Sequence, residues 1–210
     1  MLGTSSNTKE VEKINDDYLD YKYWAESDTY GEWYVKATLM SDIEKAFNEP
    51  SDSGFNKVIN NFFTAVQELA KDPSSLAVRK LLIGEGMTLS KYFNSLADHL
   101  EKLQSDINYN VKIKVDEINS YGKQIQQLNK QIFAAELDGN KANDLRDQRT
   151  YLVDKLSKLI NIEAYEVNVG LLPNGQEEKH FMITINGKAF VDHADLTQLK
   201  VEQREKKLNV

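Results

Sequence analysis

The sequence predicts a mainly α-helical protein, an elongated bundle of long antiparallel helices with a small antiparallel β-meander near the C-terminus. Apolar residues recur every three or four positions over most of the 210-residue chain, which is the spacing of one helix face. After residue 161 the spacing changes to two, with turn-forming residues between the apolar runs. We therefore expect a helical rod domain over residues 1–161, followed by a β-meander and a charged tail over residues 162–210.

A capping-box pattern, Asn7 followed three positions later by Glu10, predicts the start of the first helix. Apolar residues then continue at helical spacing through Gly31 as far as residue 47, so the pattern predicts one long helix. Pro50 ends it, and the turn-forming run that follows closes at Gly54. Pro50 and Gly54 are therefore expected to have structural roles.

A second helix is predicted over residues 55–69, and the run at residues 71–75 interrupts the helical pattern. The next helix carries the longest apolar ladder of the chain, which would span roughly 65 Å at 1.5 Å per residue. Gly139 is expected to close this helix in the left-handed C-cap position. The ladder consists of Leu89, Phe93, Leu96, Leu100, Leu103, Ile107, Val111, Val115, Ile118, Tyr121, Ile125, Leu128 and Ile132.

A return helix follows, with Asn143 as its expected cap. Four leucines at helical spacing predict an apolar seam against the long helix, and hence an antiparallel helical hairpin. These are Leu145, Leu152, Leu156 and Leu159.

Arg149 occupies a seam position of this return helix. In one interpretation its guanidinium reaches solvent at the rim of the seam. In the other, it is held by hydrogen bonds to Gln127 or Gln131 on the facing helix and fixes the register of the hairpin.

The β-rich segment contains two turn signals, residues 173–175 with the sequence Pro-Asn-Gly and residues 186–187 with Asn-Gly. They divide the segment into three strands. Thr197, Leu199 and Val201 are expected to add a short fourth strand.

The composition disfavours several classes of protein. The net charge is −7, and residues 1–60 hold 12 acidic residues against 6 lysines, so no basic stripe is available for nucleic acid. Apolar runs are too short to span a membrane, and the first residues lack the pattern of a cleaved signal peptide. The absence of cysteine excludes disulfides and thiolate chemistry.

The sequence offers no candidate catalytic, cofactor or metal site. His99, His180 and His193 lie far apart along the chain and form no spaced ligand pair, so we read them as surface or edge residues. No nucleophile motif, phosphate loop or metal-binding helix motif is present. We expect a non-enzymatic protein without a cofactor.

Aromatic residues crowd the first helix between residues 18 and 34. A single helix cannot bury all of them on one side, so some are expected to be exposed and to form a subunit interface. The alternative is that they pack under the long helix or against a neighbouring loop. The candidate interface residues are Tyr18, Tyr23, Trp24, Trp33 and Tyr34.

A set of short motifs follows in order along residues 11–165. They are Tyr18-Leu19-Asp20, Tyr23-Trp24, Asp42-Ile43-Glu44, Phe47-Asn48-Glu49-Pro50-Ser51-Asp52-Ser53-Gly54, Phe62-Phe63, Glu68-Leu69, Asp72-Pro73-Ser74-Ser75, Tyr92-Phe93-Asn94, Val115-Asp116-Glu117-Ile118-Asn119-Ser120, Asn143-Asp144-Leu145 and Asp147-Gln148-Arg149. With these motifs the chain resembles the flagellar hook-associated protein 1 family, a flagellin-related axial family.

The resemblance implies a structural subunit of the bacterial flagellum that joins hook to filament, is secreted by type III export without a cleaved signal peptide, and is extracellular. It implies hook protein, hook-associated protein 3 and sister subunits as partners, and no catalytic residues. The family's terminal helical segments have no counterpart here, so we expect this piece to be monomeric. An intracellular coiled-coil adaptor that binds a partner helix is the alternative.

Overall fold

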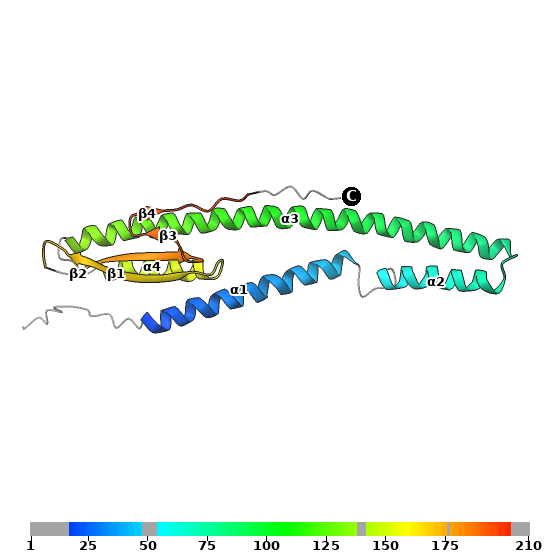
Figure 1. Cartoon of the computed structure of the whole chain (residues 1–210), viewed down its shortest axis with the longest axis horizontal. Helices are drawn as coiled ribbons and strands as arrows, with labels where there is room; N and C mark the ends of the chain where they lie inside the picture. The colour runs from blue at the N-terminus through cyan, green and yellow to red at the C-terminus, as the bar shows by residue number, and fades with distance from the viewer. Residues whose placement is uncertain (1–16, 48–53, 138–141, 176, 203–210) are drawn as a thin grey trace, which may run out of the picture. The chain divides into compact units, whose positions relative to one another are not determined.

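The computed structural model describes residues 17–47, 54–137, 142–175 and 177–202. Within them the chain is mainly α-helical with a small antiparallel sheet near the C-terminus, so the predicted fold class is confirmed (Figure 1). The helices are α1 (Asp17–Ala46), α2 (Phe55–Lys71), α3 (Leu76–Leu137) and α4 (Asn143–Ser157). The strands are β1 (Glu163–Leu171), β2 (Glu177–Ile185), β3 (Lys188–Asp192) and β4 (Asp195–Leu196).

The chain divides into two compact units. Unit 1 comprises Met1–Gly31 and Lys114–Val210, and unit 2 comprises Glu32–Ile113. Helices α1 and α3 each contribute residues to both units. The expected boundary at residue 161 stays a prediction, although it falls where helices give way to strands.

Unit 2 contains an antiparallel pair formed by α2 and the first half of α3. Phe55 at the start of α2 contacts Phe93 of α3, with ring centroids 6.2 Å apart. Phe62, further along α2, lies beside Gly86 of α3. Rising numbers on α2 thus meet falling numbers on α3. The buried apolar side chains of this unit among the described residues are Val58, Ala65 and Leu96.

Unit 1 holds the larger core, in which α4 runs back along the second half of α3. Arg146 of α4 pairs with Glu136 of α3, and Arg149 pairs with Asn129, so this hairpin is also antiparallel. Its core cluster combines α1, α3, α4 and the sheet, and consists of Trp24, Ile118, Ile125, Val153, Leu156, Ile162, Ala164, Phe181, Ile183, Phe190 and Val191.

The sheet has the order β1-β2-β3-β4, and each neighbouring pair is antiparallel. Asn186 and Gly187 both have positive φ, 51° and 72°, as a two-residue type I′ hairpin requires. The fourth strand is β4, so its predicted place at Thr197 to Val201 is wrong. That segment instead runs along α3 (Figure 1).

Several predicted helix ends can be compared with the structure. The break at residues 71–75 is confirmed, because α2 ends at Lys71 and α3 begins at Leu76. Asn143 is wrong as a cap: Ala142 is the N-cap of α4 and makes no side-chain cap hydrogen bond. Asn7, Pro50 and Gly139 lie outside the described residues.

Leu156 and Leu100 test how strongly each helix depends on its apolar ladder. Leu156 is 0% exposed in the unit 1 core, whereas Leu100 is 37% exposed, contrary to its predicted place on a packed ladder. A charge at Leu156 would be buried without a partner. We expect Leu156→Asp to cost more than about 4 kcal/mol and to abolish cooperative unfolding of unit 1, measured by urea denaturation with circular dichroism.

Leu100→Asp is the matched control, and we expect it to retain the cooperative transition. Equal losses for the two variants would contradict the burial assigned to them.

Candidate functional site

Trp24 anchors the start of α1 in unit 1. Its side chain is 8% exposed and belongs to the core cluster, and its indole Nε1 donates a hydrogen bond to Oδ1 of Asp154 on α4 at 2.7 Å. A buried indole needs such an acceptor for its N–H. Trp24 is therefore a core residue, and its predicted place among exposed interface residues is wrong.

A close backbone contact fixes the end of the α1 segment that belongs to unit 1. A Cβ added at Gly31 would lie 2.6 Å from the carbonyl oxygen of Lys158, which is closer than van der Waals contact permits. Gly31 thus allows α1 to approach the C-terminal end of α4. On the same side, the Lys158 ammonium lies 5.8 Å from the ring centroid of Tyr23.

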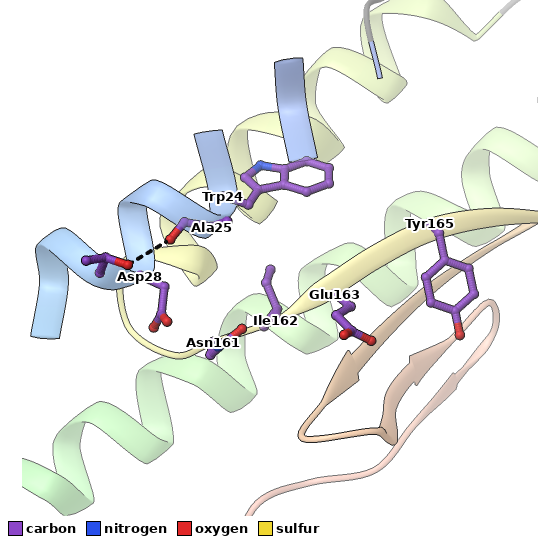
Figure 2. A pocket seen from close by; sticks show the side chains of 8 residues that line it. Trp24, Ala25, Asp28, Asn161, Ile162, Glu163 and Tyr165 are labelled. Carbon is purple, nitrogen blue, oxygen red and sulfur yellow. Dashed lines mark hydrogen bonds between the residues drawn. The ribbon is translucent and has the colours of Figure 1, made fainter. Parts of the chain in front are cut away.

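An open cleft of about 620 Å³ lies beside Trp24 in unit 1 (Figure 2). Asp28 reaches it from α1, while Glu163 and Tyr165 reach it from β1. Glu163 accepts a hydrogen bond from the Thr184 hydroxyl at 3.2 Å. The lining residues are Trp24, Ala25, Asp28, Thr29, Asn161, Ile162, Glu163 and Tyr165.

Neither a metal site nor a membrane span was found in the described part of the chain. No group of three or more His, Asp or Glu side chains there is arranged to hold a metal ion. Within the same residues, no helix has the length and apolar character needed to cross a bilayer.

Several other aromatic side chains of α1 are exposed. Trp33 is 66% and Tyr34 63% exposed, and Tyr23 is 45% exposed. Tyr18 lies within α1, but its side chain falls outside the described part of the structure. Of the candidate interface residues, Tyr23, Trp33 and Tyr34 thus have the exposure that an interface requires.

Arg149 is the most deeply buried charged residue of the described chain, at 7% exposed. Its Nη1 donates to Oδ1 of Asn129 on α3 at 3.2 Å, and its Nη2 donates to Glu166 on β1 at 2.6 Å. The guanidinium also lies over the Phe181 ring, 3.9 Å from its centroid. One side chain of α4 therefore connects α3, β1 and β2.

The structure corrects both interpretations of Arg149. The guanidinium does not reach solvent at the rim, and it donates hydrogen bonds to Asn129 and Glu166 instead of Gln127 or Gln131. Spacing along two helices could indicate that Arg149 faces the seam. It could not show that a strand would supply the carboxylate.

Glu166 is shared between two arginines. It accepts hydrogen bonds from Arg149 and, at 2.7 Å, from Nη1 of Arg146, which also binds Glu136 on α3. Burial alone would raise the pKa of Glu166, but the two guanidiniums outweigh burial and hold that pKa below its usual value. The carboxylate stays ionised at neutral pH and neutralises the buried arginine.

A second feature of unit 1 is an amide stripe on α3, formed by Asn119, Gln126 and Asn129. These side chains bind backbone groups of the C-terminal segment: Asn119 both donates to and accepts from Leu199, while Gln126 and Asn129 donate to the carbonyls of Ala194 and His193. Each residue of the stripe directly follows a residue of the apolar ladder in the sequence. The sequence did signal it, as amide residues at helical spacing.

Gly122 lies within this stripe and makes room for the sheet. A Cβ at Gly122 would lie 2.6 Å from the Phe190 ring and 2.8 Å from the Leu196 side chain. Phe190 can therefore pack directly on the helix backbone, and the amide stripe can hold the strands in register along α3.

The shared carboxylate gives a direct test of the Arg149 contacts. Glu166→Ala leaves a buried guanidinium without its anion, and we expect a loss of about 3 kcal/mol in the free energy of unfolding. Because the pKa of Glu166 is lowered by folding, its contribution is present at neutral pH and is lost as the pH falls below about 4.5. Urea denaturation, followed by Trp24 fluorescence in a Trp33→Phe background, measures both effects.

Glu177→Ala is the matched control on β2, because Glu177 is 58% exposed in a 3.5 Å pair with Lys179. We expect a change below about 0.5 kcal/mol. A loss as large as that of Glu166→Ala would show that the contacts of Glu166 with the buried arginine contribute no more to stability than an exposed ion pair.

The two tryptophans give a second test. Trp24→Ala removes a buried ring and leaves Asp154 without a donor, so we expect it to cost about 3–5 kcal/mol. Trp33→Ala alters an exposed residue and should change the free energy of unfolding by less than about 0.5 kcal/mol. Circular dichroism during urea denaturation compares them, and similar losses would refute the assignment of Trp24 to the core.

Known proteins similar to this chain are flagellar components. It is 35% identical over 163 residues to flagellar hook-associated protein 1 of Bacillus subtilis, a match that covers 78% of this chain and 32% of the relative. It is 33% identical over 127 residues to flagellar hook-associated protein 1 of Salmonella typhimurium, covering 60% of this chain and 23% of that protein.

A solved structure is also similar, that of the flagellar hook junction protein FlgK from Burkholderia pseudomallei. The TM-score is 0.64 at 23% identity, and the match covers 87% of this chain and 30% of the other, which shows a shared fold. The chain thus spans about a third or less of the length of these relatives. The family model described as "Flagellar hook-associated protein FlgK helical domain" matches residues 40–209, most of the chain, and the chain belongs to this family.

Proposed function

We propose that this chain is part of a non-catalytic structural subunit that joins hook to filament in the bacterial flagellum. The observation that carries the proposal is the family match over residues 40–209, together with relatives named as flagellar hook-associated protein 1. Because the chain spans about a third of the Bacillus subtilis relative, the proposal concerns the contribution of this helical domain to a larger subunit.

The exposed apolar side chains of unit 2 support a role in assembly. Trp33 and Tyr34 are joined on α1 by three more exposed apolar residues, a density typical of surfaces that another protein covers. The additional residues are Val35, Met40 and Ile43.

The helices themselves suit a load-bearing part. A continuous helix such as α3 distributes tension along its axis over many backbone hydrogen bonds, and the packed hairpin with α4 resists sliding through its apolar seam. The Arg149 contacts add a fixed register between α3, α4 and β1.

The partners in this role are hook protein, hook-associated protein 3 and sister subunits. The subunit works outside the cell in the flagellum, after type III export without a cleaved signal peptide. It needs no cofactor and has no catalytic residues. The names of the relatives and the motifs along residues 11–165 support this account.

A chimera tests the proposal. Residues 17–202 would replace the corresponding stretch of the Bacillus subtilis relative in cells that lack their own copy. We expect filaments to form, visible by electron microscopy. A chimera that is present at normal levels in the culture medium but yields no filaments would overturn the proposal.

The same chimera tests the aromatic surface. We expect Tyr34→Ala to reduce the number of filaments per cell several-fold, because Tyr34 is 63% exposed on the candidate interface of α1. Tyr109→Ala is the matched control, since Tyr109 is 66% exposed on α3. Unchanged filament numbers in Tyr34→Ala, or an equal reduction in Tyr109→Ala, would remove α1 from the interface.

A further inference from the structure

Two of the three histidines stack on each other in unit 1. His180 lies on β2 and His193 lies in the turn between β3 and β4. Their ring centroids are 4.0 Å apart, and their planes differ by 7°. We call these two residues the histidine pair. The third histidine, His99, is exposed on α3 within unit 2.

His193 is held where it is by contacts on several sides. Its backbone N–H donates to the Phe181 carbonyl at 3.0 Å, and its own carbonyl accepts from Asn129 at 2.9 Å. The ring packs edge-on against Phe133 of α3, with centroids 5.6 Å apart. Its φ is +44°, a region that non-glycine residues rarely adopt unless their surroundings impose it. His193 thus connects β2, the β3–β4 turn and α3.

The surroundings of the pair disfavour positive charge. The positive charge of Arg149 on α4 disfavours protonation of the His193 ring. Helix α3 contributes only the uncharged Phe133 and Asn129 to the contacts named above. Nδ1 of His193 is buried without a hydrogen-bond partner among the described residues. A proton there would place charge on a buried atom beside another imidazole.

Two carboxylates oppose this effect. Glu178 of β2 lies 3.0 Å from Nε2 of His180, and Asp192 of β3 precedes His193. Burial nevertheless lowers the pKa of His193, aided by His180 and Arg149, and the two carboxylates do not restore it.

We propose that the histidine pair is a pH-sensitive contact, and that protonation of His193 at mildly acidic pH releases the β3–β4 turn from α3. The neutral pair stacks and keeps the turn against Phe133 and Asn129. A charged His193 ring is repelled by Arg149 and loses its packing against Phe133 and His180, so the contacts that impose the strained backbone at His193 are lost. This inference is independent of the proposed flagellar function.

The direction of the pH dependence follows from linkage. Folding lowers the pKa of His193 below the value of about 6.5 that an unfolded histidine has. The unfolded chain therefore binds more protons at mildly acidic pH. The contribution of the contact is fully present above about pH 6.5 and is lost as the pH falls through the lowered pKa.

The experiment is urea denaturation of the 210-residue chain at pH 7.5 and pH 5.5. The chain has two tryptophans, so a Trp33→Phe background leaves the buried Trp24 to report on unit 1. We expect the urea midpoint to fall by roughly 0.5 M or more at the lower pH. We expect His193→Gln to lose most of this fall, and the control His99→Gln to keep it.

A midpoint that does not fall with pH, or an equal fall in His193→Gln, would overturn the proposal. Direct titration of the histidine rings by NMR in the unmutated chain gives a second measurement should His193→Gln fail to fold. We expect His193 to protonate below the value of about 6.5 that an unfolded histidine has, and the backbone signals of residues 190–199 to shift with it. Protonation of His193 at or above about pH 6.5 would contradict the proposal.

Discussion

The burial of one guanidinium organises unit 1. Arg149 is charged at any pH the protein meets, so it can be buried only where anions and dipoles surround it. Glu166 and Asn129 satisfy that requirement from β1 and α3, and Phe181 covers the planar face from β2. These contacts fix how the hairpin and the sheet lie relative to each other, in an arrangement that also places the amide stripe of α3 against residues 193–199.

The two units differ in how far their apolar residues are covered by this chain itself. In unit 1 the apolar faces of α3, α4 and the sheet close on one another around fully buried residues such as Ile125, Leu156 and Ile183. In unit 2 the apolar side chains on α1 remain exposed, Trp33 among them. This contrast fits a subunit in which unit 1 provides a stable framework and unit 2 provides surface for other protein segments.

Sequence periodicity predicts the helices and strands well because spacing is local information. The break before α3 and the Asn186-Gly187 hairpin follow from single turns, and the ladder predicts α3 itself. The periodicity fails where distant segments decide the outcome. Trp24 is buried where Asp154, 130 positions away, accepts its indole N–H, and His180 meets His193 through the register in which β2 pairs with β3. The carboxylate partner of Arg149 was missed for the same reason.

Unit 1 has a closed core, whereas unit 2 buries few apolar side chains within this chain, and this contrast should appear as a difference in local stability. Native-state amide hydrogen exchange of the 210-residue chain, resolved by mass spectrometry, tests it most directly. We expect slow exchange in α4, in β2 and in residues 114–137 of α3, and much faster exchange in α2 and in residues 76–113 of the same helix. Equal protection along all of α3, or slower exchange in α2 than in α4, would contradict it.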